Sequence, residues 1–334
     1  PNPSCRYHRP PLEGWRYKRA GYFSRQHPPH RIQRYQCRAC HRCFSTQTFS
    51  TTYWQKLPGL DARIFMRLVG GMANRQIARD LGVSPKTIDD RIARMGRHCM
   101  LFHGKQMQNA PPVRELVVDG FETFELSQYY PFHINLGVEK HTDFIVYFTD
   151  SELRRKGRMT DYQKRRRDQL EGEFGRPDPR AIQKGMRELL EVSLKGTSGA
   201  VVYSDDHPSY PPAIRRVPCR ITHRVTSSKV RRTRSNPLWE VNLADLLIRH
   251  SESNHKRETI AWSKRRQAAF ERLFPFLLWR NYIKRRREKV RGSPTPAMTR
   301  GMTTDVGRID DILGARIFRD HVDLPPRWSQ YYQR

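Results

Sequence analysis

Acidic residues follow short apolar runs at two places in this basic chain. Asp119 follows the apolar residues of "ELVVDGFE", and Asp205 and Asp206 end "GAVVYSDD". Two carboxylates side by side at the ends of strands repel each other unless a divalent cation offsets their charge. Mg²⁺ suits such a pair, because it is a hard ion that takes carboxylate and phosphate oxygens. The alternative is that these acids are ordinary turn residues.

A third carboxylate is expected to complete a metal site of this kind. Glu240 lies on the first turn of a helix predicted for "NPLWEVNLADLLIRH". A ligand there projects from a rigid element, and its charge favours the helix N-terminus. Glu252 and Glu258 compete with it, but Glu252 falls in a polar stretch that we expect to face solvent, and Glu258 is flanked by basic residues. We therefore predict Glu240 as the third acid, beside Asp119 and Asp205.

The N-terminal segment offers a second kind of metal site. Cys5-x-x-His8 and Cys37-x-x-Cys40 are two ligand pairs on tight turns. Their number and type match the tetrahedral nitrogen and sulphur coordination of Zn²⁺. A segment this polar has little apolar core, so one structural zinc ion would hold it folded. The alternative is a set of free surface thiols in a basic arm, and two nearby residues compete as ligands: His41 and Cys43.

Helical periodicity begins near Leu60 and continues to about Leu101. Within it, "NRQIARDLGVSPKTIDDRIARM" has the pattern of two helices joined by a sharp turn. Gly82 permits the turn, Ser84 can cap the second helix, and Pro85 suits its first position. The outward face of that helix is predicted to carry Lys86, Thr87, Asp89, Asp90, Arg91 and Arg94.

Four residues of this outward face are predicted to bind DNA: Lys86, Thr87, Arg91 and Arg94. Arginine reads guanine by two hydrogen bonds or contacts phosphate, whereas an aspartate can only accept from cytosine N4. The alternative is a plain helical hairpin that packs on a neighbouring part of the protein.

The acids need a sheet to position them, and the sequence predicts one after the break at Ala110. Three strands in meander order are expected at 115–125, 131–139 and 144–150, and two more at 199–205 and 218–225. A basic stretch at about 151–178 interrupts the order. Helices are expected at about 178–194 and from 236 to about 289, followed by a linker, "RGSPTPAM", and a tail.

Length and charge limit the classes of function. The 334 residues are enough for two or three domains. The formal net charge of +30, with 63 Lys plus Arg against 33 Asp plus Glu, favours a polyanionic partner such as nucleic acid. No apolar run long enough to span a membrane is present, so we expect a soluble intracellular protein. The six cysteines cluster toward the N-terminus, which favours metal over disulfides, and because the sequence starts at Pro1 we expect residues before it.

The order of these motifs resembles the DDE transposases of bacterial insertion sequences. "QRYQCRACHRCFSTQT" is similar to the zinc ribbon of that family, and "NPLWEVNLADLLIRHSESNHKRETIAWSKR" is similar to the segment that bears its third acid. The resemblance implies a multidomain protein of mixed α+β and α/β class. Its parts are a zinc ribbon at 1–55, a helix-turn-helix domain at 56–108 and a ribonuclease-H-like catalytic domain at 109–290. The basic insert at about 151–178 and a tail of unknown role at 291–334 depart from the family.

The family chemistry gives the expected function. Two Mg²⁺ ions, held by Asp119, Asp205 and Glu240, support strand cleavage and strand transfer at the ends of a DNA element. By the same resemblance Asp206 is a supporting acid or a turn cap and not a ligand. The partner is double-stranded DNA, the active form is a homodimer or larger, and the setting is the bacterial cytoplasm at the nucleoid. Two other functions remain open: a domesticated DNA-binding regulator with an inactive core, and a structure-selective nuclease of the same fold.

Overall fold

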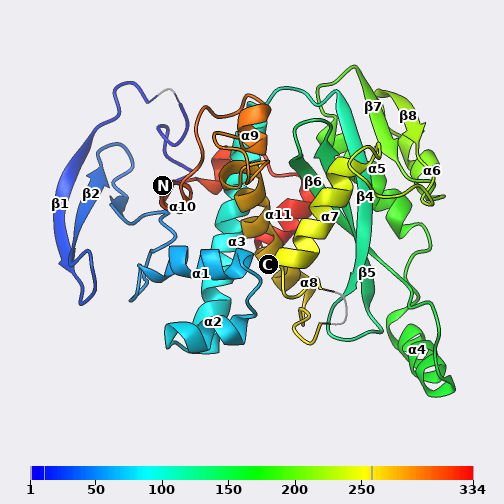
Figure 1. Cartoon of the computed structure of the whole chain (residues 1–334). Coiled ribbons are helices and arrows are strands. Elements are labelled where there is room, and N and C mark those ends of the chain that lie inside the picture. The colour runs from blue at the N-terminus through cyan, green and yellow to red at the C-terminus, as the bar shows by residue number, and fades with distance from the viewer. Residues whose placement is uncertain (1, 11, 257–258, 334) are drawn as a thin grey trace. The chain divides into compact units, whose positions relative to one another are not determined.

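A computed structural model describes residues 2–10, 12–256 and 259–333 of the chain (Figure 1). The chain forms two compact units, and each is built from segments that are distant in sequence. Unit 1 contains residues 1–67, 74–109 and 307–334, and unit 2 contains 68–73 and 110–306. The two ends of the chain therefore belong to the same unit.

The N-terminal part of unit 1 is a small antiparallel sheet. Its strands are β1 (Tyr17–Ser24), β2 (Arg31–Cys37) and β3 (Cys43–Ser45), in the order β1-β2-β3. Almost every side chain of β1 is exposed, so this sheet has very little apolar core. A fold with so little buried apolar surface needs another source of stability, such as a bound metal.

Three helices follow in the chain: α1 (Leu60–Val69), α2 (Asn74–Leu81) and α3 (Pro85–Gln108). The predicted turn between the last two is confirmed. Gly82 has a φ of 64°, and the Ser84 hydroxyl accepts a hydrogen bond from the backbone N–H of Thr87 at 3.1 Å. Pro85 begins α3, as predicted, and the helix continues beyond the expected end near Leu101.

The C-terminal segment of unit 1 packs on α3. It contains α10 (Ile309–Gly314), the 3₁₀ turn η2 (Arg319–His321) and α11 (Pro326–Gln333). Ile317 and Val322 are buried in a cluster with Leu101 of α3. At Gly104 of α3, an added Cβ would come within 2.8 Å of the Leu324 side chain, so glycine permits this close packing.

Unit 2 is built on a mixed five-stranded sheet. Its strands are β4 (Glu115–Phe124), β5 (Pro131–Glu139), β6 (Phe144–Glu152), β7 (Gly199–Ser204) and β8 (Arg220–Val225). The order is β6-β5-β4-β7-β8. The meander β4-β5-β6 is antiparallel, as predicted, while β7 runs parallel to both β4 and β8. The central position of β4 brings it next to β7, although 74 residues separate the end of one strand from the start of the other in the chain.

Helices pack against this sheet. α7 (Trp239–Ser251) packs on β4 and β5, and α5 (Ala181–Ser193) packs on β5 and β6. The basic stretch at about 151–178 contains a helix that the sequence did not predict, α4 (Asp161–Phe174). The shorter elements are α6 (Tyr210–Ile214), the π-helical turn η1 (Trp279–Ile283) and α9 (Pro296–Thr299).

The long helical region expected at 236–289 is not continuous. It divides into α7 and α8 (Arg266–Leu278), which are separated by an irregular segment. The polar run that follows α7 explains the interruption, because Ser and Asn side chains compete for backbone hydrogen bonds. None of the helices in the described ranges has the length and apolarity required to cross a bilayer.

Candidate catalytic centre, zinc site and DNA-binding helices

Asp119 and Asp205 lie side by side on neighbouring parallel strands, but Asp119 is in the middle of β4 and not at a strand end as predicted, whereas Asp205 directly follows β7. Val117 of β4 is paired with Tyr203 of β7, so the two aspartates, each two residues further on, come side by side. Gly120 after Asp119 has a packing reason. A Cβ at Gly120 would lie 2.3 Å from Nε2 of His133 on β5, which only glycine avoids.

The electrostatics of this pair are those of an acidic site in which no basic side chain of the described residues forms an ion pair with either carboxylate. Burial and the charge of Asp205 raise the pKa of Asp119 to about 6, even though Arg232 acts in the opposite direction. Within the described residues, no Lys or Arg nitrogen lies within ion-pair distance of either aspartate. Burial, followed by the charges of Asp119 and Asp205, raises the pKa of the neighbouring Tyr210 hydroxyl. A divalent cation would supply the missing positive charge, and the oxygen donors suit Mg²⁺.

The predicted third acid, Glu240, is not beside this pair. Its carboxylate accepts a hydrogen bond from Lys140 Nζ at 2.8 Å and another from the backbone N–H of His141 at 3.1 Å. Lys140 and His141 follow the end of β5, whereas Asp119 is paired with Leu136 of that strand. Leu136 is four residues before Lys140, which is roughly 13 Å along the strand at 3.3 Å per residue. Glu240 is buried and paired, and it fixes the start of α7 to the β5–β6 turn, so the structure separates it from the other two acids.

The carboxylate of α7 that lies at the level of Asp119 is Asp245. α7 follows the direction of β4: Glu240 is near the start of the strand, and Arg249 lies over the ring of Phe121 at 4.9 Å. Asp245 is between these two points and pairs with Arg249 at 3.0 Å. Its charge contributes to the raised pKa of Asp119. The sequence reasoning missed Asp245 because a mid-helix acid has no distinguishing local pattern.

The other acids considered from the sequence have different surroundings. Glu252 was expected to face solvent, and this was wrong: it is 0% exposed and pairs with Arg272 at 3.2 Å. Burial raises the pKa of Glu252 to about 7, although Arg272 opposes the shift. Asp206 is exposed and accepts hydrogen bonds from the side chain and backbone of Ser228, which lower its pKa. Glu258 lies outside the described residues.

Three of the four predicted zinc ligands converge in unit 1. The sulphur atoms of Cys5, Cys37 and Cys40 lie within 4.8 Å of one another, and those of Cys5 and Cys37 are 3.9 Å apart. Burial opposes ionisation of Cys37, but N–H groups of Cys40, Trp15 and Ala39 direct hydrogen bonds to its sulphur and lower its pKa to about 6. A thiolate stabilised in this way is the form that binds zinc. The donor set therefore fits Zn²⁺.

The remaining predicted ligand, His8, is not part of the thiol group and instead contacts residues near the end of the chain. Its side chain is 7% exposed, and its Nε2 lies 3.3 Å from Oδ2 of Asp320. The competing ligand Cys43 is exposed and is not part of the thiol group. Among the described residues, the acids around Asp119 do not converge as closely as these three sulphur atoms do.

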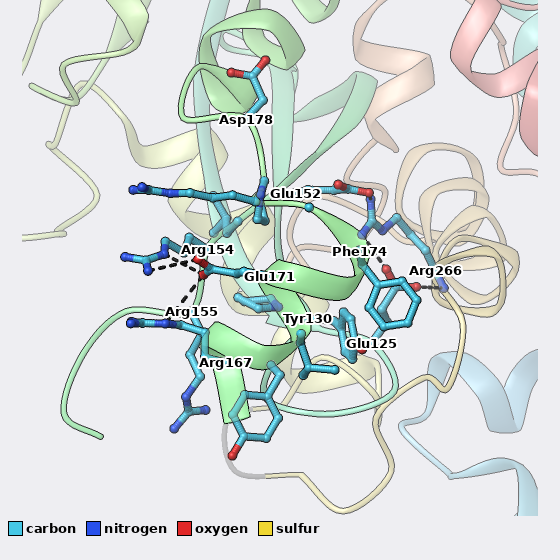
Figure 2. A pocket seen from close by; sticks show the side chains of 17 residues that line it. Glu125, Tyr130, Glu152, Arg154, Arg155, Arg167, Glu171, Phe174, Asp178 and Arg266 are labelled. Atoms are coloured by element: carbon cyan, nitrogen blue, oxygen red, sulfur yellow. Dashed lines mark hydrogen bonds and ion pairs between the residues drawn. The ribbon is translucent and has the colours of Figure 1, made fainter. Parts of the chain in front are cut away.

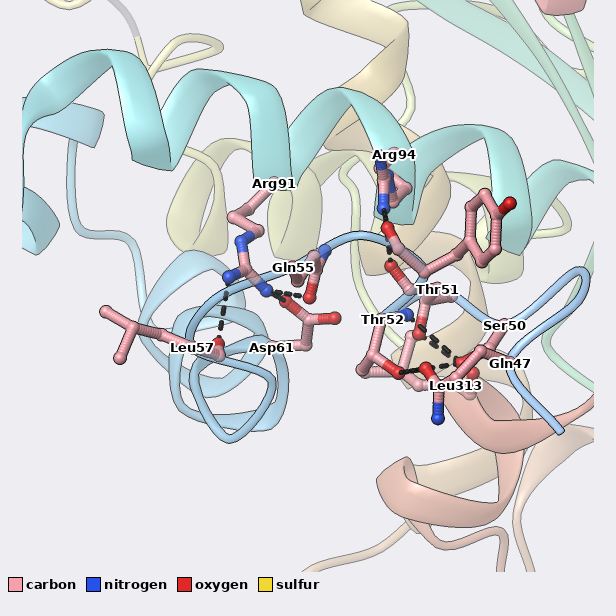
Figure 3. Close-up of polar contacts among 11 residues, drawn as sticks. Gln47, Ser50, Thr51, Thr52, Gln55, Leu57, Asp61, Arg91, Arg94 and Leu313 are labelled. Carbon is pink, nitrogen blue, oxygen red and sulfur yellow. Dashed lines mark hydrogen bonds and ion pairs between the residues drawn. The ribbon is translucent and has the colours of Figure 1, made fainter. Parts of the chain in front are cut away.

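The predicted position of Arg91 on the outward face of α3 is wrong (Figure 3). Arg91 is 7% exposed, and its guanidinium pairs with the Asp61 carboxylate of α1 at 2.7 Å. It also donates to the Leu57 carbonyl at 2.8 Å and to the Gln55 side chain. Sequence periodicity cannot distinguish a solvated arginine from one that holds a loop against a helix, because both lie beside the apolar stripe.

Arg94 has a similar role to that of Arg91. Figure 3 shows its guanidinium directed at the loop before α1, where it donates to the carbonyls of Thr51 at 3.1 Å and Tyr53 at 2.5 Å. It is half-buried, not free on the surface. Lys86 is exposed, as predicted, and pairs with Asp90 at 2.6 Å, while Thr87 is half-buried. The exposed basic residues of α2 are Arg75 and Arg79, and they were not among the predicted DNA-binding residues.

A cavity of about 370 Å³ lies in unit 2 where α4 meets the sheet (Figure 2). Arg154 donates to the Glu171 carboxylate at 2.7 Å and 3.1 Å, which fixes α4 to the strand end. The lining mixes arginine with glutamate, and Glu152 on its wall is paired with Phe132 of β5. Phe132 is four positions from Leu136, the partner of Asp119. The cavity is therefore separate from the aspartate pair.

Comparisons with known proteins do not assign a family. No family model matches the chain, and no curated protein matches it. Among solved structures, it is similar to a chain of the cryo-EM structure of the simian T-cell lymphotropic virus intasome in complex with PP2A regulatory subunit B56 gamma. That similarity covers 59% of this chain and 58% of the other at 10% identity, with a TM-score of 0.26. At this TM-score the likeness carries no conclusion about activity.

Proposed function

We propose that this protein is a DNA transposase that cuts and joins strands at an acidic, magnesium-binding centre. The observation that carries the proposal is the position of Asp119 and Asp205 on neighbouring parallel strands, where no Lys or Arg of the described ranges forms an ion pair with them. The sheet order β6-β5-β4-β7-β8, with helices packed on it, suits the ribonuclease-H-like core that the sequence resemblance implies. The net charge of +30 supports a nucleic-acid substrate.

The residues of the centre have separate tasks. When bound, Mg²⁺ would activate the attacking water or hydroxyl and stabilise the leaving oxygen of the DNA strand. Asp119 and Asp205 would hold the metal, and Asp119 must lose its proton first because its pKa is raised to about 6. We propose Asp245, and not Glu240, as the third acid, because Asp245 lies at the level of Asp119 on α7.

The remaining parts of the molecule would position DNA. One zinc ion held by Cys5, Cys37 and Cys40, with His8 as the fourth ligand, would fold the N-terminal sheet. α2 and α3 would form the helix-turn-helix, with Lys86, Arg75 and Arg79 contacting phosphate. The protein would work on double-stranded DNA as a homodimer or larger, because two element ends must be processed together. Its location would be the bacterial cytoplasm at the nucleoid.

The test begins with finding the DNA. Purified protein is used to enrich fragments from a sheared genomic library, and the enriched fragments then serve as substrates for nicking and strand-transfer assays with Mg²⁺. Asp119→Asn, Asp205→Asn and Asp245→Asn should bind these fragments but not cut them, because removing one carboxylate disables a two-metal site. Asp206→Asn is the matched control and should stay active, because Asp206 is exposed beside the centre.

The outcomes separate the candidate third acids. Activity in Asp119→Asn or Asp205→Asn would overturn the proposal. Glu240→Gln should remain active but less stable, because its buried carboxylate anchors α7. If Asp245→Asn cuts DNA and Glu258→Gln does not, the third acid is Glu258.

A DNA-binding regulator with an inactive core is the second candidate. The observation that favours it is the lack of close convergence between Asp119, Asp205 and a third acid in the described ranges. Such a protein would bind the enriched fragments tightly and show no nicking with Mg²⁺ or Mn²⁺. A structure-selective nuclease would instead cut DNA without any strand-transfer product.

A further inference from the structure

The last residues of the chain pack against its first residues within unit 1. Arg9 donates to the backbone carbonyl of Asp320 at 3.1 Å, and the ring of Phe318 contacts the ring of Phe49 at 4.6 Å. Arg316 donates to the carbonyl of Thr46. The tail segment from Arg316 to His321 is therefore attached to the module that contains the three thiols.

His8 lies in this contact and lacks hydrogen-bond partners for its imidazole within the described residues. Its imidazole is 7% exposed and lies against the ring of His321 at 4.7 Å. Neither ring nitrogen makes a hydrogen bond within the described part of the chain, although Nε2 is at ion-pair distance from Asp320. Burying an imidazole without hydrogen bonds is costly, so a buried histidine three residues after Cys5 points to a ligand that the chain does not supply.

We propose that Asp320 is a positioning residue for the zinc site, which acts by accepting the Nε2 proton of His8. The Nε2–Oδ2 distance of 3.3 Å allows this contact with a small rotation of the ring. A carboxylate that accepts from one ring nitrogen fixes the tautomer and leaves the other, Nδ1, as a neutral metal ligand. Nδ1 of His8 then joins Cys5, Cys37 and Cys40 as the fourth zinc ligand. The inference rests on the zinc site proposed above.

This assignment gives the C-terminal tail a function. Because Asp320 contacts the zinc ligand only when the tail is docked, zinc binding and tail docking stabilise each other, and the effect is reciprocal. The same tail carries Ile317 and Val322, which are buried beside Leu101 of α3. Zinc would thus stabilise the helical part of unit 1 as well as the small sheet.

The test measures zinc release from the full-length protein into a chromogenic chelator. Asp320→Asn should weaken zinc binding about 10- to 100-fold, as expected for loss of a carboxylate behind a histidine ligand. Asp320→Glu should recover part of that loss. Asp310→Asn is the matched control, because Asp310 is an exposed acid of the same tail. Equal zinc affinity in Asp320→Asn and Asp310→Asn would overturn the inference.

Cobalt substitution identifies the nitrogen ligand. The Co²⁺ protein should show the visible spectrum of three thiolates and one imidazole, His8→Ala should lose the imidazole contribution, and Asp320→Asn should retain it. If His321→Gln removes it instead, His321 is the ligand and the inference is wrong. If the wild-type protein binds neither zinc nor cobalt, the zinc site itself fails, which is a different result.

Tail docking provides a readout that does not depend on metal spectra. Chelation of zinc should accelerate trypsin cleavage after Arg316, an exposed residue of the tail, and Asp320→Asn should show the faster cleavage even with zinc added. Cleavage that is unaffected by chelation would show that the tail docks without the metal, and would contradict the coupling.

Discussion

Two clusters of charged groups, one in each unit, show opposite ways of arranging charge that is at least partly buried. In unit 1, Asp61 pairs with Arg91 at 2.7 Å, and both side chains are buried. In unit 2, Asp119 and Asp205 are two like charges, and burial and their mutual repulsion raise the pKa of Asp119 to about 6. A pair that is complete within the chain serves structure. A cluster with an uncompensated charge is where a ligand from outside, such as the Mg²⁺ proposed above, would gain binding energy.

The largest expected effect tests the uncompensated cluster. Asp205→Asn should reduce Mg²⁺-dependent nicking by about 10³-fold or more, roughly 4 kcal/mol of transition-state stabilisation, while DNA affinity stays within about twofold. Nicking of the enriched fragments measures the first effect and gel-shift titration the second. An equal loss of DNA affinity would mean that Asp205 supports folding, like Asp61, and the contrast between the clusters would disappear.

The next largest effect tests the complete pair. Arg91→Met leaves Asp61 buried without its partner and should lower the free energy of unfolding by about 3 kcal/mol or more, as found when one member of a buried pair is removed. Urea unfolding followed by circular dichroism measures the change. The double variant Asp61→Leu with Arg91→Met should recover most of it, because both charges are then gone. If the Arg91→Met protein is as stable as the wild type, the ion pair does not stabilise the fold, and Arg91 becomes a candidate for DNA contact again.

Metal binding should depend on pH in unit 2. The pKa of Asp119 is higher in the folded protein than in the unfolded chain. Protonation of Asp119 therefore stabilises the folded protein at low pH, and this stabilisation is lost as the pH rises through about 6. Mg²⁺ binding needs the ionised form, so Mg²⁺ should stabilise the protein by about 2.7 kcal/mol at 100 times its Kd at pH 7.5. Calorimetry at pH 5 should show little stabilisation, and Asp119→Asn should show none at either pH.

The smallest expected effect concerns exposed charge, which differs from both clusters. Lys86→Ala on α3 should weaken binding to the enriched DNA by about 1 kcal/mol without changing the free energy of unfolding. The slope of the logarithm of the binding constant against the logarithm of the salt concentration should decrease in magnitude by about one. Binding measured at several salt concentrations checks this. Asp89→Asn, another exposed residue of α3, is the matched control and should not reduce affinity. An unchanged salt slope in Lys86→Ala would show that α3 does not face DNA.

Local patterns predicted the elements well where one physical cause determined them. The Ser84 cap, the Gly82 turn and the meander from Glu115 to Glu152 follow from capping, backbone freedom and alternation of apolar residues. The placing of Asp119 beside Asp205 also followed, since both end apolar runs on strands that the fold makes neighbours. The convergence of Cys5, Cys37 and Cys40 was predicted by their spacing and type.

The errors occurred where a side chain's partner is distant in sequence. Glu240 was chosen for its place on a helix, but its bonds to Lys140 and His141 depend on how α7 lies against the sheet. Arg91 and Glu252 were both expected to face solvent, and each is buried against a charge on another element. Nothing in the residues next to them indicates that pairing.

The sequence by itself therefore indicated the kind of chemistry available: thiols that suit zinc, aspartates after apolar runs that suit magnesium, and excess positive charge that suits nucleic acid. Only the tertiary structure decided which acid shares a level with Asp119, and that the tail after Gly307 returns to the first residues of the chain. The physical reason is that capping and periodicity act over a few neighbouring residues. Charge pairing and metal coordination act through space, between residues such as His8 and Asp320 that the chain separates by hundreds of positions.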